Sequence, residues 1–315
     1  MATPVVGVSP PPSVHRRRGV SWRRETQAWA FVAPVALLVG IGVLFPLGYV
    51  LLLSAFDYSP YLGKATQFIA LRNYREVVAD AAFWNALAAS AIWVLGSVVP
   101  QFLLGLCMAL VLNERFHGRG IVRTIILAPW AVSGVVTGFI WMWIFDGTIG
   151  VLNDLLMKVG LVDAPVPWGI YDSTTWLMVL VANAWRGAPF FAIVILAALQ
   201  AIDPALYEAA SIDGGTRSQK FRFITWPLIF NAVVISTLLR ALWTFNFIDL
   251  LWTMTRGGPA GATTTLPIYI FDVVYQKGQF GYGAALSVVL CVILVTFSLV
   301  YWQLNRMDRT TRRTS

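Results

Sequence analysis

The sequence predicts an all-α, polytopic membrane protein with six transmembrane helices. Of its 315 residues, 58% are hydrophobic and only 12% are charged, and the mean hydropathy is +0.70. A soluble domain carries about 25% charged residues. A helix needs roughly 20 apolar residues to cross a bilayer. Six segments meet this length, and they lie near 28–54, 84–112, 121–145, 175–200, 228–252 and 282–304.

Polar, basic tails flank the apolar part of the chain. Residues 1–27 are rich in proline and then in arginine, and residues 305–315 are also basic. The apolar run that follows the first tail is longer than the 7–15 residues of a signal-peptide core, so we expect a retained helix. The transmembrane domain is therefore expected to cover residues 28–304.

Lysine and arginine placement predicts that both termini are cytoplasmic. With the N-terminus inside, the inner segments hold 15 of these residues and the outer segments hold 6, while Arg186 and Arg240 lie within helices. Cytoplasmic loops carry the excess of positive charge in membrane proteins. Orientation in the membrane thus explains the formal charge of +8 better than nucleic-acid binding does.

The sequence offers neither a metal site nor a catalytic centre. The cysteines, Cys107 and Cys291, lie in apolar runs, and the histidines, His15 and His117, are isolated in basic segments. The phosphate-binding pattern G-x-x-x-x-G-K-[ST] is absent, as are H-E-x-x-H and G-x-S-x-G. We therefore expect no catalytic residue, no bound metal and no ATPase activity in this chain.

The loop at 203–227 has its own helical signals. Asp203 can cap a helix, Pro204 fits the first turn, and the glycine pair at 214–215 can end it. A second amphipathic piece follows, with Phe221, Phe223 and Ile224 among basic residues. The small surface at 209–210 would allow close approach by a partner. From these residues alone, a plain interfacial loop explains the pattern equally well.

A family resemblance favours the functional interpretation of this loop. The string Glu208-Ala209-Ala210-Ser211-Ile212-Asp213-Gly214, with Ile224 and Pro227 downstream, resembles the EAA loop of permease subunits in ABC importers. Trp226 departs from the leucine usual in that family. Four further stretches resemble its carbohydrate and glycerol-phosphate branch, namely 183–190, 255–259, 264–267 and 280–287. The resemblance covers the chain from about Ala28 to Arg306.

The resemblance implies a type I ABC importer transmembrane-domain fold in a bacterial or archaeal cytoplasmic membrane. It implies a second homologous permease, an external substrate-binding protein, and two ATPase subunits that bind ATP and magnesium. No cofactor is expected in this chain, and no nucleic acid. The residues implied to couple the chain to the ATPase are Tyr207, Glu208, Ala209, Ala210, Asp213 and Gly214.

Two arginines mark the expected transport path. Arg186 and Arg240 lie about 17–18 Å into their spans, because a helix rises about 1.5 Å per residue. Buried ionisable residues are costly in a membrane and are candidates for function. Their polar and aromatic neighbours suit a sugar. The full candidate set is Asn183, Trp185, Arg186, Arg240, Trp243 and Asn246.

Alternatives remain open at this stage. An arginine at this depth could instead bond backbone carbonyls freed near Pro189. The expected substrate is a sugar or small oligosaccharide, and the competing substrate is glycerol 3-phosphate or a related phosphodiester, which two unpaired arginines would favour. An autonomous secondary transporter is less favoured, because the spans offer almost no carboxylate for a coupling ion.

Overall fold

A computed structural model describes residues 22–63 and 66–311 of the chain. The described residues are almost entirely helical, which confirms the predicted all-α fold. A short hairpin also occurs, in which β1 (Phe56–Asp57) pairs antiparallel with β2 (Gln67–Phe68). Residues 1–21 of the predicted N-terminal tail and residues 312–315 of the predicted C-terminal tail lie outside the described residues.

The chain divides into two units, and the first ends at Tyr49. It contains α1 (Trp22–Val39), a turn of π-helix, η1 (Gly40–Leu44), and the start of α2 (Phe45–Leu53). The stretch Val32–Leu53 is long and apolar enough to cross a membrane. It corresponds to the first predicted span.

Long helices build the second unit, which begins at Val50. They are α4 (Ala81–Asn113), α8 (Asp172–Gln200), α11 (Trp226–Asn246) and α14 (Phe280–Thr311). The helices α4 and α8 approach closely at Gly105, where an added Cβ would lie 2.4 Å from Cβ of Phe191. Phe191 also belongs to a buried apolar cluster to which α4, α8 and α11 all contribute. Its members include Leu112 of α4, Ile195 of α8 and Ile229 of α11.

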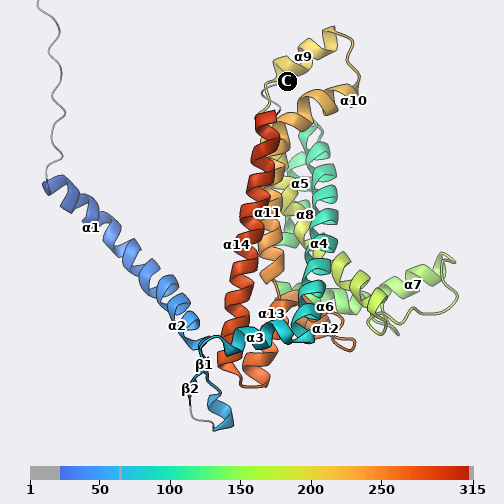
Figure 1. Cartoon of the computed structure of the whole chain (residues 1–315). Coiled ribbons are helices and arrows are strands. Elements are labelled where there is room, and N and C mark those ends of the chain that lie inside the picture. The colour runs from blue at the N-terminus through green and yellow to red at the C-terminus, as the bar shows by residue number, and fades with distance from the viewer. Residues whose placement is uncertain (1–21, 64–65, 312–315) are drawn as a thin grey trace, which may run out of the picture. The chain divides into compact units, whose positions relative to one another are not determined.

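Short elements gather at the two ends of these long helices (Figure 1). One end carries α9 (Pro204–Ile212) and α10 (Arg217–Lys220). The opposite end carries α3 (Arg72–Ala79), α12 (Asp249–Thr255), α13 (Leu266–Phe271) and the turns η2 (Pro60–Leu62) and η4 (Asp272–Gln276). A further short helix, α7 (Val151–Lys158), follows α6 (Gly134–Ile144). We call the first end the α9 end.

The predicted span at 121–145 is divided by a sharp bend in the structure. The structure has α5 (Arg119–Ala131) and α6 (Gly134–Ile144), bent by 100° at the break between them. Ser133 starts a new helix at the break, because its side chain accepts a hydrogen bond from the backbone N–H of Val136. Among the described residues, five helices are long and apolar enough to span a membrane, or six if this bent pair forms one span.

The predicted fifth span at 228–252 is displaced. Its helix begins at Arg217 and runs through α10, a π-helical turn η3 (Phe221–Thr225) and α11 to Asn246. The chain then breaks at residues 247–248 before α12. Small residues let α6 approach α12, since a Cβ on Gly138 would lie 2.9 Å from Cβ of Thr253. The two helix breaks therefore lie in one packed region.

Candidate functional site

The predicted short helix in the loop is present as α9. The Asp203 side chain caps it by accepting a hydrogen bond from the N–H of Ala205 at 2.9 Å, and Pro204 occupies the first turn. Gly214 follows the helix with φ of +73°, a conformation that costs a side chain about 1–2 kcal/mol. The N–H of Gly215 closes the end by donating to the carbonyl of Ala210 at 2.8 Å. Local sequence signals alone specify this helix.

Side-chain hydrogen bonds hold α9 against the helix that leads into the membrane. The Tyr207 hydroxyl lies 2.9 Å from Oγ1 of Thr225, which is buried in η3. Lys220 donates to Oγ of Ser211 at 2.6 Å, and that hydroxyl donates to the Tyr207 carbonyl. These contacts form a brace between α9 and the start of α11, and we call it the α9 brace. Tyr207 therefore points toward the protein, whereas it was expected among the residues that couple to a partner.

Other candidates in the loop lie on the surface. Glu208, Ala209, Asp213 and Gly214 are exposed, and Ala210 is partly buried. Ile212 is 87% exposed, so α9 also presents a large apolar group at its surface. Ile212 stands in the string that resembles the EAA loop, but it was not among the residues expected to couple to the ATPase. An isoleucine in an otherwise polar helix end was the signal that could have found it.

Buried polar side chains join α4, α8 and α11 at the middle of the long helices. Gln101 accepts a hydrogen bond from Nε of Arg240 at 2.6 Å and donates to the Asn183 carbonyl at 2.9 Å. Nδ2 of Asn183 donates to Oγ of Ser97 at 2.8 Å. Nε1 of a tryptophan on α4 donates to a backbone carbonyl of α11 at 2.9 Å. We call this group the polar seam, and its members are Trp93, Ser97, Gln101, Asn183, Arg240 and Thr244.

Two of the path candidates belong to the polar seam and are buried in this structure. Arg240 is 4% exposed and Asn183 is fully buried, so neither lines an open cavity, contrary to what their depth suggested. Neither Arg186 nor Arg240 belongs to the ion pairs found among the described residues. Sequence reasoning missed Gln101, although Ser97 lies four positions before it and therefore on the same face of α4.

Arg186 links the two helix breaks. Its Nε donates to the carbonyl of Val132 at 3.2 Å, at the end of α5, and its guanidinium lies 4.5 Å from the ring centroid of Phe247, at the end of α11. Carbonyls at a helix end have no partner within the helix, and a guanidinium can satisfy them. A carbonyl bond of this kind was one of the predicted alternatives, although its acceptor belongs to α5 and not to the turn near Pro189.

The remaining path candidates do not gather in one place. Trp185 is 38% exposed and meets Trp141 edge to face at 5.9 Å. Trp243 is 49% exposed and meets Phe190 at 5.2 Å. Asn246 donates to a backbone carbonyl of its own helix and lines a groove of about 520 Å³ between α11 and α14. These side chains therefore point in different directions.

Within the described residues, no group of three or more histidines, cysteines or carboxylates is placed to hold a metal ion. Cys107 and Cys291 are free, exposed thiols.

Comparison with known proteins identifies close parallels. A family model described as "Binding-protein-dependent transport system inner membrane component" matches residues 101–312. The trehalose/maltose transport system permease protein MalF of Thermococcus litoralis is 31% identical over 92% of this chain and 97% of its own length. The trehalose transport system permease protein SugA of Mycobacterium tuberculosis is 30% identical over 91% of this chain and 92% of its own. The sulfoquinovosyl glycerol transport system permease protein SmoG of Agrobacterium fabrum is 31% identical over 87% and 89%.

A solved structure has the same fold. A chain of a bacterial ABC transporter involved in the import of the acidic polysaccharide alginate superposes with a TM-score of 0.79, covering 90% of this chain and 96% of its own at 22% identity. The same transporter has been solved in complex with a periplasmic protein bound to an alginate pentasaccharide. These matches confirm the family and the fold that the resemblance implied.

Proposed function

Because the chain belongs to the family of binding-protein-dependent transport system inner membrane components, we propose that it is the transmembrane permease subunit of an ATP-driven sugar importer. The observation that carries this proposal is the similarity, over nine-tenths of the chain, to permeases that serve trehalose, maltose and sulfoquinovosyl glycerol. The braced helix α9 supports it, because a capped helix with an exposed surface can receive a separate motor subunit.

The chain works as one part of an assembly. A second, homologous permease completes the channel, and two ATPase subunits bind ATP and magnesium beneath the α9 end. An external binding protein delivers the sugar at the opposite end. This chain itself catalyses no reaction. Both termini and the α9 end then face the cytoplasm, as the placement of lysine and arginine predicts.

Alternating access follows from the contacts of α11. The α9 brace ties the docking helix to the start of α11, so a movement of the ATPase is passed into that helix. The polar seam ties α11 to α4 and α8, and Arg186 ties its far end to the break after α5. A displacement of α9 therefore moves several spans together, which opens and closes a path on one side of the membrane at a time.

A sugar is favoured over glycerol 3-phosphate or a phosphodiester. The argument for an anion rested on two unpaired arginines in the membrane. Arg240 is instead bonded to Gln101 and buried, and Arg186 is bonded to a backbone carbonyl. Neither guanidinium needs an anionic substrate as its partner.

Uptake by the reconstituted transporter tests the proposal. With the partner permease, the ATPase and the binding protein in liposomes, we expect Glu208→Ala and Gly214→Asp to reduce uptake of radiolabelled trehalose or maltose at least tenfold, while ATP hydrolysis continues. Glu114→Ala, an exposed glutamate at the end of α4, is the matched control and should transport normally. Normal uptake by both loop variants, or gradient-driven uptake by this chain alone, would overturn the proposal.

A further inference from the structure

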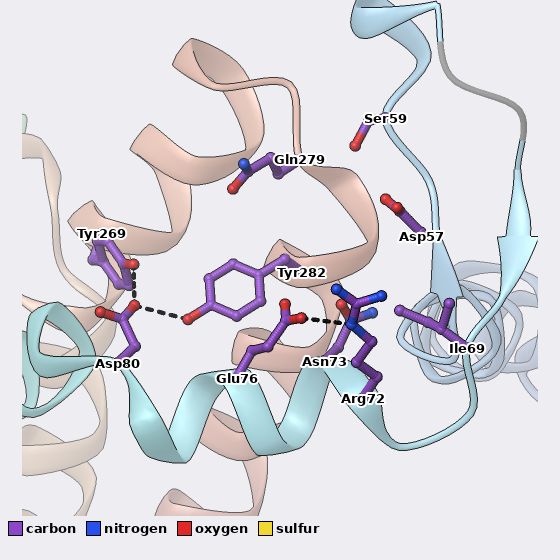
Figure 2. A pocket seen from close by; sticks show the side chains of 10 residues that line it. All are labelled: Asp57, Ser59, Ile69, Arg72, Asn73, Glu76, Asp80, Tyr269, Gln279 and Tyr282. Atoms are coloured by element: carbon purple, nitrogen blue, oxygen red, sulfur yellow. Dashed lines mark hydrogen bonds and ion pairs between the residues drawn. The ribbon is translucent and has the colours of Figure 1, made fainter.

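A polar pocket of about 440 Å³ lies at the end of the second unit opposite α9 (Figures 1 and 2). Its walls come from the β1–η2–β2 segment, from α3 with the start of α4, and from the corner between η4 and α14. Its volume falls within the range of roughly 300–1,000 Å³ typical of small-molecule sites. We call it the outer pocket, and its lining residues are Asp57, Ser59, Ile69, Arg72, Asn73, Glu76, Asp80, Tyr269, Gln279 and Tyr282.

Hydrogen bonds among the lining residues fix one side of the outer pocket. Oδ2 of Asp80 accepts from the hydroxyls of Tyr269 and Tyr282, and Oδ1 accepts from the N–H of Ala82. Burial opposes ionisation of Asp80, but these donors and nearby Lys277 outweigh it and hold the carboxyl pKa below its ordinary value. Burial and the Asp80 carboxylate raise the pKa of Tyr269 to about 12. Both tyrosine rings are thereby held in place.

The hairpin side is anchored as well. Nδ2 of Asn73 donates to the carbonyls of Ser54 at 2.8 Å and Phe56 at 3.0 Å, which fastens β1 to α3. Arg72 pairs with Glu76 along α3 at 2.8 Å. The walls of the pocket are thus held by contacts that do not involve a ligand.

Three polar side chains in the outer pocket have no partner among the described residues. Ser59 is only 5% exposed, and its hydroxyl makes no hydrogen bond there. The carboxylate of Asp57 and the amide of Gln279 are likewise without side-chain hydrogen bonds in the described part of the chain. Figure 2 shows the Ser59 hydroxyl and the Asp57 carboxylate directed inward from the hairpin side. Polar groups that face a hollow without a protein partner are available to hydrogen-bond a ligand.

We propose that the outer pocket binds one or two units of a neutral sugar at the entrance to the transport path, an inference that rests on the proposed function. A sugar hydroxyl both donates and accepts, and the free groups of Asp57, Ser59 and Gln279 supply both partners. The ring of Tyr282 stands in the middle of the pocket, where an apolar sugar face can lie against it (Figure 2).

The charge of the lining selects against anionic sugars. The carboxylates of Asp57, Glu76 and Asp80 face a single lining guanidinium, that of Arg72, which already pairs with Glu76. A phosphate or uronate in this pocket would meet uncompensated carboxylate charge, and like charges at close range repel. The pocket therefore favours neutral saccharides.

Protection of a single thiol tests the inference. Ile69→Cys, at a lining residue to which no sugar hydrogen bond is assigned, is introduced into the complete transporter in nanodiscs, in a background with Cys107→Ser and Cys291→Ser, and is reacted with a membrane-impermeant thiol reagent. We expect trehalose or maltose to slow the reaction at least fivefold, and glucose 6-phosphate at the same concentration to leave it unchanged. Adding Asp57→Asn should remove the protection. A thiol at the 62% exposed Tyr171, from Tyr171→Cys, is the matched control and should react equally with and without sugar.

Each outcome decides between distinct claims. Equal reaction rates with and without sugar would overturn the pocket inference, and normal sugar uptake in the same preparation would leave the proposed function intact. If the binding protein slows the thiol reaction in the absence of sugar, the pocket receives a basic side chain of that protein. That result would also overturn the inference. Ser59→Ala provides a second readout, because it should weaken low-concentration sugar uptake while the amount of assembled transporter stays the same.

Discussion

The hydrogen bond between Gln101 and Arg240 predicts that one substitution destabilises the fold and that a second substitution restores stability. Gln101→Leu removes the acceptor of a guanidinium that is 4% exposed, from a bond of 2.6 Å. A buried hydrogen bond to a charged group contributes about 1.5–3 kcal/mol. The bond from Gln101 to the Asn183 carbonyl adds roughly 0.5–1.5 kcal/mol. We expect the free energy of unfolding to fall by about 2–4 kcal/mol.

Replacing both partners should restore much of that loss. Arg240→Met combined with Gln101→Leu leaves no buried charge and no orphaned amide, and such apolar replacements are often close to neutral. The assay is equilibrium unfolding in mixed micelles with increasing SDS, applied to both single variants and the double variant. If the double variant is destabilised by the sum of the single effects or more, the reasoning about the polar seam is refuted.

Three further predictions follow from contacts described above. Gly187→Ala would place a Cβ 2.2 Å from Cδ of Gln101, so we expect a loss of about 1–3 kcal/mol in the same unfolding assay, and unchanged stability would contradict the packing. Tyr207→Phe removes the hydrogen bond to Thr225, which contributes about 0.5–1.5 kcal/mol. It should lower the ratio of sugar imported to ATP hydrolysed by about two- to tenfold. An unchanged ratio would argue against the α9 brace. The lowered pKa of Asp80 stabilises the fold above its unfolded value near 4, and this contribution is lost as pH falls through the folded pKa. Unfolding between about pH 2 and 5 should therefore show a smaller acid dependence for Asp80→Asn than for the unaltered chain.

Matched substitutions separate these effects from general perturbation. Gly147→Ala adds a Cβ where nothing lies within 4 Å, and Tyr171→Phe removes a hydroxyl from a side chain that is 62% exposed. Asp163→Asn changes an exposed carboxylate far along the chain from Asp80. We expect each control to match the unaltered chain in its respective assay.

The elements that the sequence predicted correctly are those specified by neighbouring residues. The helix α9 is an example, because its cap, its first-turn proline and its terminal glycines all lie within a dozen positions. The break at Ser133 was missed because hydropathy and capping give opposite signals there. The run 121–145 is apolar throughout, and a single serine cap ends one helix and begins another inside it.

The contacts of the candidate site could not be predicted, because they join distant parts of the chain. Gln101 bonds residues 82 and 139 positions away, and Trp93 bonds one 151 positions away. The sequence predicts how deep Arg186 and Arg240 lie in their spans. It does not predict which neighbouring helix each side chain faces. Both were therefore expected to be unpaired, and the structure gives each a neutral partner.

The unbroken helix from Arg217 to Asn246 works as a lever. Its 30 residues span roughly 45 Å at 1.5 Å per residue. A tilt of about 5° at the end that α9 holds would displace the other end by about 4 Å, by the same helical dimensions. That displacement exceeds the length of a hydrogen bond, about 2.7–3.2 Å. If α9 receives the ATPase as proposed, a small tilt at that end is enough to break and remake hydrogen bonds at the other end.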